Sequence, residues 1–310
     1  MPQESQVKLA GQSSENTSFF DLKERLIMGL GLLPQNILSY ITGGLVRLRF
    51  PNLIQSQINQ YFIWIFGINM TEASKPLASY ASIEEIFTRE LSPNKRLVTG
   101  SYVASADGML ELSRSALSGE DAVQAKGLIY SLGELIFGQT ADSGRGVFAP
   151  RWFTTVYLAP HNYHRVHAPF SCSVSKIRYI PGRLWPVNRP AVRAISRLFC
   201  RNERLVFDCQ FENGAKAWVV MVGAFNVGRM VTRLNPEFVT NSLARQFNWS
   251  HAARELTLPA NTTVAVGDEL GVFMLGSTTV VVMDELAVNT LKPREILTTE
   301  AVSMGHSLSV

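Results

Sequence analysis

The sequence has few charged residues for its length. Asp, Glu, Lys and Arg make up 17% of the 310 residues, against about 25% in an average soluble domain. Hydrophobic residues make up 46%, and the mean hydropathy is +0.08. This composition excludes a disordered tail protein, a collagen and a coiled coil, and it leaves a globular protein with enough chain for a sizeable core.

Cysteines are also few, and the basic residues do not cluster. Cys172, Cys200 and Cys209 are an odd number and lack metal-ligand spacing, so we expect reduced, buried thiols in a cytosolic compartment and no metal site. The net charge is only +4. Because no Lys/Arg run or RNA-binding aromatic signature accompanies it, we expect no nucleic-acid partner.

A secretory signal and a clean membrane span are absent from the sequence pattern. Residues 1–16 are polar and are expected to be a disordered tail. The uncharged stretches Leu26–Val46 and Asn52–Thr71 approach the length of a span, but Pro, Gly, Asn and Gln interrupt them. We expect residues 17–76 to form amphipathic helices that associate with a membrane. The alternative is a helical subdomain packed on the protein's own core.

The remainder, residues 77–310, has the texture of a β-rich catalytic domain. Short β-branched and aromatic runs alternate with Gly, Pro and Asn, which predicts a mainly antiparallel β body and an α+β fold class. The expected strands include residues 153–158, 206–207, 218–222, 262–266 and 279–283. A helix is expected near 190–201, and Ser82–Glu85 has the pattern of a capping box that opens a short helix.

Three of the five histidines, His161, His164 and His167, lie in one segment. On a strand His161 and His167 would share a face while His164 points away, so a zinc tripod is geometrically awkward. A role in proton transfer is favoured because imidazoles titrate near neutral pH. Hydrogen-bonded structural histidines are the alternative.

Two short motifs are unremarkable when each is taken alone. Asp107-Gly108 has the pattern of a turn. Gly276-Ser277 lies between two expected strands, where it also reads most simply as a turn. A glycine there has no Cβ to crowd an approach to the carbonyl that precedes Ser277.

Together, these fragments resemble the phosphatidylserine decarboxylase family in its membrane-associated bacterial form. The resemblance rests on Asp107-Gly108, Tyr163–His167 and Leu275–Thr278, in this order and at this spacing. Supporting matches are Phe87–Leu91, Lys126-Gly127, Pro186–Asn188 and Arg201–Arg204. It covers about residues 20–307, and the histidine motif combined with Gly-Ser-Thr is specific where each motif alone is not.

The resemblance implies that the chain makes its own prosthetic group. The hydroxyl of Ser277 would attack the carbonyl of Gly276, and β-elimination and hydrolysis would then leave a pyruvoyl group derived from Ser277. By similarity His167 is the base for this step and Asp107 orients it, in the manner of a catalytic triad. The products would be a β chain of residues 1–276 and an α chain of residues 277–310.

The resemblance further implies a lyase that converts phosphatidylserine to phosphatidylethanolamine. The pyruvoyl carbonyl would form a Schiff base with the substrate amine and accept the electrons that remain when CO₂ leaves. His164 is the family's candidate general acid. The implied partners are phosphatidylserine, anionic membrane lipids, the two chains of one precursor and possibly a second copy in a homodimer. The implied location is peripheral, on the cytoplasmic side of the cell membrane.

Four arginines, Arg189, Arg193, Arg197 and Arg201, recur at intervals of four. On one helix they would share a face, and we expect that face to meet anionic headgroups. A solvated helix face is the alternative.

Two other functions remain open from the residues themselves. The first is a serine hydrolase with Asp107, His167 and Ser277 as a lasting triad, although no Gly-x-Ser-x-Gly elbow surrounds Ser277. The second is a lipid-binding module without catalysis, which would leave the histidine cluster unexplained.

Overall fold

The computed structural model describes most of the chain. The described residues are residue 29 and residues 35–117, 121–125, 128–138, 149–225, 229–240, 253–274 and 277–310. The expected polar tail, residues 1–16, and Gly276 of the expected cleavage site lie outside the described residues.

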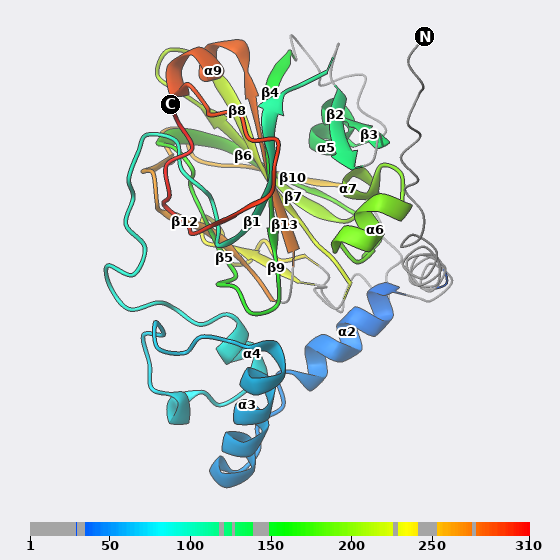
Figure 1. The fold of residues 1–310 in the computed structure, drawn as a ribbon, viewed down its shortest axis with the longest axis vertical. Helices are drawn as coiled ribbons and strands as arrows, with labels where there is room; N and C mark the ends of the chain where they lie inside the picture. Colours follow the sequence, from blue (N-terminus) through cyan, green and yellow to red (C-terminus); the bar gives the residue numbers. More distant parts are fainter. Residues whose placement is uncertain are drawn as a thin grey trace, which may run out of the picture.

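A nine-stranded antiparallel sheet is the largest element of the fold (Figure 1). Its order is β10-β6-β7-β8-β13-β4-β1-β14, with β11 also paired to β6. The strands are β1 (Gly108–Ser115), β4 (Pro150–Leu158), β6 (Cys172–Ile180), β7 (Arg204–Gln210), β8 (Lys216–Val222), β10 (Arg254–Thr257), β11 (Thr263–Val264), β13 (Ser277–Asp284) and β14 (Glu300–Val302). The predicted α+β class with a mainly antiparallel β body is confirmed.

Strand β13 lies inside this sheet, between β8 and β4. Seven of its eight residues are buried, which explains its nearly continuous run of Thr and Val. Such a run is typical of a strand covered on both faces. The strand begins two residues before the expected start at residue 279, so Ser277 is already part of the sheet, opposite Leu158 of β4.

Two smaller sheets complete the β structure. One has the order β5-β12-β9, formed by β5 (Arg165–His167), β12 (Glu269–Phe273) and β9 (Met230–Thr232). The other pairs β2 (Asp121–Ala125) with β3 (Leu128–Ser131). The three-stranded sheet matters for the site because the chain passes between it and the large sheet twice. It passes once from β4 to β5 and once from β12 to β13.

The described helices near the N-terminus gather at one end of the β body (Figure 1). They are α2 (Gln35–Leu45), α3 (Asn52–Phe66), the 3₁₀ turn η1 (Leu77–Ser79) and α4 (Ile83–Phe87). The predicted cap of α4 is confirmed, because Ser82 accepts a hydrogen bond from the backbone N–H of Glu85 at 3.2 Å. In return the Glu85 carboxylate accepts one from the N–H of Ala81, as in a capping box shifted by one residue.

The remaining described helices are short and pack around the sheet. They are α5 (Leu132–Phe137), α6 (Arg189–Ala194), α7 (Leu198–Arg201) and α9 (Glu285–Leu291). The three cysteines are free and buried, as expected. Burial raises the pKa of Cys200 to about 12, so its thiol stays protonated at neutral pH.

The prediction of one helix over residues 190–201 is wrong. Helix α6 ends at Ala194 and α7 begins at Leu198, with Arg197 between them in the left-handed conformation at φ 56°. The side chain of Gln124 stabilises the break: its amide donates to the carbonyls of Val192 and Ile195 and accepts from the N–H of Leu198. A distant residue therefore satisfies backbone groups that a continuous helix would have paired internally.

The break between α6 and α7 also means that the predicted row of four arginines on one helix face does not form. Arg189 pairs with Glu111 of β1, whereas Arg197 pairs with Glu134 of α5. The four arginines therefore do not share one helix face.

The motif Asp107-Gly108 is more than a turn. Gly108 is the first residue of β1, and a Cβ there would lie 2.2 Å from the carbonyl oxygen of Tyr157 on β4. Only glycine permits this close approach of the two backbones. The approach places Asp107 immediately before β1, next to the strand that leads into the histidine segment.

Candidate functional site

Ser277 stands at a junction between the large sheet and the three-stranded sheet. It opens β13 opposite Leu158, the last residue of β4. It is fully buried, and its hydroxyl has no hydrogen-bond partner among the described residues. A buried hydroxyl without a partner is costly, so this one is a candidate for chemistry rather than for structure.

The histidine segment forms a turn between β4 and β5. The turn begins after Leu158 and is closed by a reciprocal contact in which Ala159 N–H donates to Asn162 Oδ1 at 2.8 Å. At its other end the N–H of Phe273, the last residue of β12, donates to the carbonyl of His164 at 3.0 Å. Leu158 before the turn pairs with Ser277, and His164 at its other end accepts from Phe273, so the turn lies against the end of β12 and the start of β13. The two predicted motifs are thereby brought together.

This turn resolves the conflict in the predicted strand geometry. His164 lies before β5, so it does not alternate with His167 along one strand. Both side chains are buried. His161 does not join these two buried histidines. Its backbone carbonyl accepts a hydrogen bond from Arg89.

His164 is neutral and has one free nitrogen. Its Nδ1 lies 2.8 Å from the carbonyl oxygen of Asn162; since a carbonyl only accepts, Nδ1 carries the proton. Nε2 then keeps its lone pair, and it has no partner among the described residues. The ring packs on Phe87 at 3.9 Å between centroids, and burial lowers the pKa of His164 to about 3.

His167 is held in the same tautomer. Its Nδ1 donates to the carbonyl of Gly267 at 2.7 Å, which leaves Nε2 to accept the hydroxyl proton of Tyr163 at 3.0 Å. Burial is the largest cause that lowers its pKa. The result is a neutral, oriented imidazole whose Nε2 is suited to take a proton.

Asp107 does not contact His167 in this structure, contrary to the predicted triad. The described acceptor at His167 Nδ1 is the Gly267 carbonyl. Asp107 is buried, and Arg96 Nε approaches its two oxygens at 2.8 and 3.1 Å. The N–H of Met304 donates to the same carboxylate at 2.8 Å.

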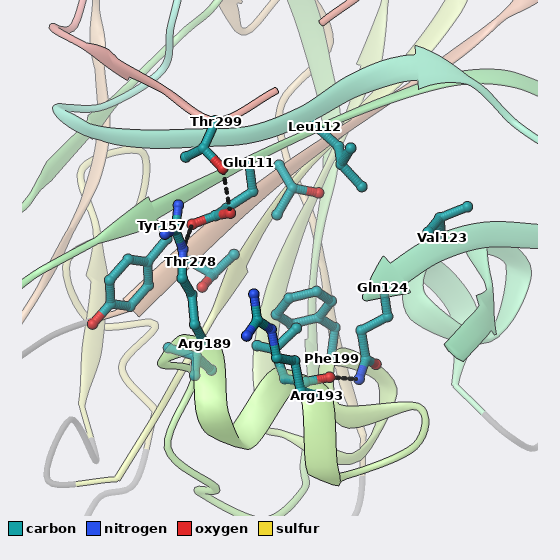
Figure 2. A pocket seen from close by; sticks show the side chains of 13 residues that line it. Glu111, Leu112, Val123, Gln124, Tyr157, Arg189, Arg193, Phe199, Thr278 and Thr299 are labelled. Atoms are coloured by element: carbon teal, nitrogen blue, oxygen red, sulfur yellow. Dashed lines mark hydrogen bonds and ion pairs between the residues drawn. The ribbon is translucent and has the colours of Figure 1, made fainter. Parts of the chain in front are cut away.

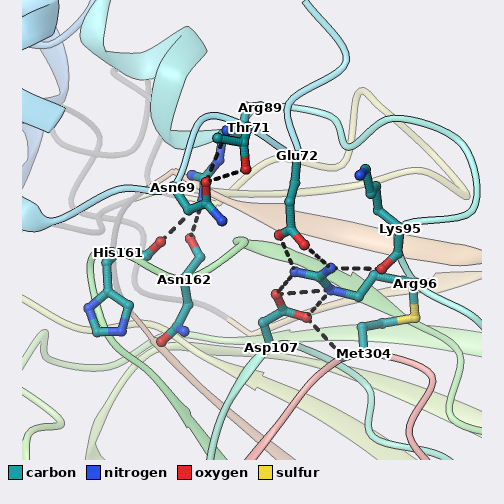
Figure 3. A network of polar contacts seen from close by, with 10 residues as sticks. All are labelled: Asn69, Thr71, Glu72, Arg89, Lys95, Arg96, Asp107, His161, Asn162 and Met304. Carbon is teal, nitrogen blue, oxygen red and sulfur yellow. Dashed lines mark hydrogen bonds and ion pairs between the residues drawn. The ribbon is translucent and has the colours of Figure 1, made fainter.

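Arg96 joins this acid to the N-terminal region (Figure 3). Its guanidinium lies between the carboxylates of Asp107 and Glu72, with distances of 3.1 and 2.9 Å to the two oxygens of Glu72. The hydrogen bond from Arg96 lowers the pKa of Glu72, and the bond to Asp107 is the largest cause that raises the pKa of Arg96. The network holds Asp107 by an ion pair with Arg96 and by the N–H of Met304, without a contact to the imidazole.

The sequence did not indicate the roles of Arg96 and Gly267, nor the hydrogen bond from the Tyr163 hydroxyl to His167. Tyr163 lies inside the histidine motif and was available as a candidate. Arg96 and Gly267 had no local signal, because their partners are 11 and 100 residues away in the chain.

The buried histidines predict a pH-dependent stability. Between pH 6.5 and about 3 the unfolded chain binds a proton at residue 164 that the folded chain does not, so stability should fall as pH falls through this window. His164→Asn can keep a donor toward the Asn162 carbonyl without titrating. We expect the midpoint of thermal unfolding to fall less from pH 7.5 to pH 4.5 in His164→Asn than in the unsubstituted protein. A difference between the two proteins that does not change with pH would contradict this assignment.

The described residues combine a buried serine with two neutral imidazoles in a β-rich fold. These are the residue types that an enzyme needs for nucleophilic attack and proton transfer. Among the described residues, no group of three His, Cys, Asp or Glu side chains is arranged to hold a metal ion.

Comparison with known proteins identifies the family. The family model described as phosphatidylserine decarboxylase matches residues 83–309. The phosphatidylserine decarboxylase proenzyme of Nitrosospira multiformis is 37% identical over 80% of this chain and 83% of its own length. The proenzyme of Psychrobacter cryohalolentis is 38% identical over 79% and 84%, and that of Helicobacter pylori is 31% identical over 88% and 98%. The chain belongs to the phosphatidylserine decarboxylase family of carboxy-lyases, and the resemblance noted in the sequence is confirmed.

Proposed function

We propose that this chain is a proenzyme that cleaves itself between Gly276 and Ser277 and then converts phosphatidylserine to phosphatidylethanolamine. The observation that carries the proposal is the buried hydroxyl of Ser277, which lacks a described partner and opens a strand beside the histidine turn. Its family membership supports the substrate, since the similar proteins are named as proenzymes of this decarboxylase.

The first stage is an acyl shift within the chain. The Ser277 oxygen bonds to the Gly276 carbonyl carbon as the C–N bond breaks, and the hydroxyl proton passes to nitrogen by way of a base. His167 is the proposed base because its Nε2 carries the lone pair. Tyr163 must release that nitrogen first, since its hydroxyl now donates to it. Loss of the α-proton and of the ester oxygen then separates the chains, and hydrolysis with loss of ammonia leaves the pyruvoyl group at residue 277.

Asp107 takes part at a distance in this scheme. Both carboxylate oxygens of Asp107 contact Arg96 and form no hydrogen bond with His167. Its negative charge is nevertheless among the causes that raise the pKa of His167. Asp107 therefore supports the imidazolium that forms when His167 accepts a proton.

The site fits the prosthetic group that the family implies. Ser277 is the residue from which a pyruvoyl group can form, and it is buried opposite Leu158, where the histidine turn begins. A pyruvoyl group, when formed, supplies a carbonyl that withdraws the electrons left by departing CO₂. The chain's own contribution is a dry surrounding, which strengthens such electrostatic effects.

His164 is the proposed donor of the proton that replaces CO₂. It must gain that proton at Nε2, and in the present environment burial opposes this, as the pKa of about 3 shows. A substrate carboxylate entering the site would favour the charged ring, because an opposite charge nearby raises a histidine pKa. Protonation of His164 is thus coupled to substrate binding.

Helix α3 is built to contact a membrane surface. Two of its polar residues face the protein: Gln55 and Asn59 are buried and hydrogen-bonded to each other at 2.7 Å. Several of its large apolar residues face outward, with Leu53 85% and Trp64 75% exposed. A helix packed only on its own core would bury such residues. Among the described residues, no helix is long and apolar enough to cross a bilayer.

We propose a peripheral location on the cytoplasmic side of the cell membrane, with the exposed apolar residues of α3 among anionic lipids. The double substitution Leu53→Asp and Trp64→Gln should weaken sedimentation with phosphatidylserine-containing liposomes by about tenfold or more, since it removes two large apolar contacts. Leu297→Asp is the matched control, because Leu297 is 57% exposed on the β body. Equal losses from both proteins, or no loss from the double variant, would contradict this placement.

The two alternatives drawn from the sequence are less well supported. A serine hydrolase needs a connected triad, but His167 Nδ1 bonds to Gly267 and Asp107 bonds to Arg96. A lipid-binding module without catalysis conflicts with membership of an enzyme family.

Mass spectrometry of the denatured protein tests the proposal. We expect two chains, residues 1–276 and residues 277–310, with the second lacking a free amino terminus. We expect the two chains to stay together in the native protein, where a homodimer would appear as twice the combined mass. A purified, active protein that contains only the intact 34.4 kDa chain would overturn the proposed self-cleavage.

A further inference from the structure

Arg89 is a buried arginine without a carboxylate partner among the described residues. An arginine side chain usually either pairs with a carboxylate or reaches solvent. Arg189 and Arg193 show both cases at a cavity of about 160 Å³, which is lined by α6 and by strands of the large sheet, Thr278 of β13 among them (Figure 2). Arg189 pairs with Glu111 at 3.1 Å, and Arg193 is exposed. Arg89 is only 4% exposed, and its guanidinium donates to backbone carbonyls instead.

The guanidinium of Arg89 contacts the histidine turn, residues 159–164, at two consecutive carbonyls. Its Nη2 donates to the carbonyl oxygen of His161 at 3.1 Å and to that of Asn162 at 3.4 Å (Figure 3). The Asn162 carbonyl is also the acceptor for His164 Nδ1 at 2.8 Å. One carbonyl therefore joins the cation to the ring, and Arg89 holds the atom that decides which nitrogen of His164 carries the proton.

The two residues before Arg89 join the same segment to the turn by separate contacts. The ring of Phe87 packs on the ring of His164 at 3.9 Å between centroids. The carbonyl of Thr88 accepts from Arg165, the residue after the turn, at 3.1 Å from Nε and 2.9 Å from Nη2. Three consecutive residues at the C-terminal end of α4 thus fix the position of the turn.

The burial of this guanidinium is costly. Burial is the largest cause that lowers the pKa of Arg89, because the charged form loses its hydration. Its Nε has no partner among the described residues, so the backbone carbonyls do not satisfy the whole group. A neutral side chain could join α4 to the β body with less desolvation. The presence of a cation therefore points to a role for the charge.

We propose that Arg89 is a positioning residue for decarboxylation, which fixes the histidine turn so that His164 keeps its proton on Nδ1 and exchanges protons at Nε2. The inference rests on the proposed function, in which His164 donates the proton that replaces CO₂. Arg89 acts through the Asn162 carbonyl and needs no contact with the substrate. His167 is held separately by the Gly267 carbonyl, so self-cleavage does not depend on Arg89.

The charge of Arg89 also acts on the ring of His164. Burial is the largest cause that lowers the pKa of His164, and the charges of Arg89 and His161 lower it further. The hydrogen bond to the Asn162 carbonyl acts in the opposite direction. Removal of the Arg89 charge should therefore raise the pKa of His164. Because a general acid works in its protonated form, the fall of kcat at high pH should then move to higher pH.

The test measures decarboxylation per mole of cleaved chain, so that a loss of folded protein does not count. Arg89→Gln should lower kcat by about tenfold, which is part of the about 10²–10⁴-fold that a positioned general acid contributes. KM should be nearly unchanged, self-cleavage should proceed at a near-normal rate, and the kcat profile should move to higher pH. Arg89→Lys should restore part of kcat and the original profile, because it keeps the charge but not the planar fork.

A double-mutant cycle with His164→Ala separates positioning from a general structural role. In the His164→Ala background, Arg89→Gln should lower kcat no further, because the residue through which Arg89 acts is absent. Arg254→Gln is the matched control. Arg254 is half-buried and donates to the Val239 carbonyl at 2.8 Å, and its substitution should leave kcat and the pH profile unchanged.

The assignment of Arg89 would be overturned by an unchanged kcat in Arg89→Gln, by an equal loss in Arg254→Gln, or by equal losses with and without His164. If Arg89→Gln does not fold, Arg89→Lys decides by the same cycle. A loss that disappears in the His164→Ala background supports the assignment, and an unchanged kcat or a loss of the same size in both backgrounds overturns it. A kcat that His164→Ala leaves unchanged, or absence of self-cleavage in the unsubstituted protein, would instead count against the proposed function.

Discussion

Replacement of Ser277 by alanine is expected to leave the chain intact and to abolish decarboxylation. The reason is that alanine has no oxygen to attack the preceding carbonyl, and it cannot become a pyruvoyl group by elimination. Residue 277 is fully buried within the sheet, and removal of a hydroxyl without a described partner should not destabilise the fold. Denaturing mass spectrometry should show a single 34.4 kDa species, and assays with phosphatidylserine should show no CO₂ release.

Ser105→Ala provides the matched control for this substitution. Ser105 is also a buried serine, and its hydroxyl contacts that of Thr279 on the same strand at 3.0 Å. We expect Ser105→Ala to cost about 1 kcal/mol in the free energy of unfolding and to be cleaved normally. A cleaved Ser277→Ala chain would place the nucleophile elsewhere, and equal failure of both variants would indicate a general loss of folding.

Replacement of His167 by alanine is expected to slow self-cleavage by about 10²–10⁴-fold, the usual contribution of a positioned general base. In the unsubstituted protein the Gly267 carbonyl orients the ring and leaves Nε2 as the basic atom. The measurement is the fraction of cleaved chain over time after synthesis. Tyr163→Phe is the informative comparison, because it removes the hydroxyl that donates to Nε2 and should cleave at least as fast as the unsubstituted chain.

The pH dependence of cleavage supplies a second check on His167. The base must be neutral, and burial lowers its pKa below the usual value of about 6.5. The cleavage rate should therefore stay nearly constant as pH falls through 6.5 and should decline only at lower pH. A rate that is already halved near pH 6.5, or a His167→Ala chain that cleaves at the normal rate, would exclude His167 as the base described here.

Several local features were predictable because their causes lie within a few residues. The cap at Ser82 and helix α3 follow from adjacent polar and apolar side chains. The strands were predicted from their β-branched runs, and β13 extends two residues further because pairing with β4 and β8 continues to the start of the strand. The prediction of one helix over residues 190–201 was wrong. Gln124, which lies on β2, forms hydrogen bonds with the backbone at the centre of that segment.

The candidate site divides in the same way. The sequence motifs named Asp107, His164, His167 and Ser277, and the fold places the histidine turn beside the strand that Ser277 opens. The partners of those residues were not predictable: Arg96 for Asp107, the Gly267 carbonyl for His167 and Phe87 for His164. Each partner comes from a different part of the chain, so no local pattern records it.

By itself, the low content of charge and the order of three short motifs determined the class of this protein: a β-rich family member with an apolar N-terminal region. Residue type was sufficient there because a serine, two imidazoles and a carboxylate carry their chemistry wherever they lie. Tertiary structure alone decided which nitrogen of each imidazole holds the proton, which cation holds Asp107, and which side of β13 opens into a cavity. These depend on burial and on hydrogen bonds between distant segments, which exist only once the chain has folded.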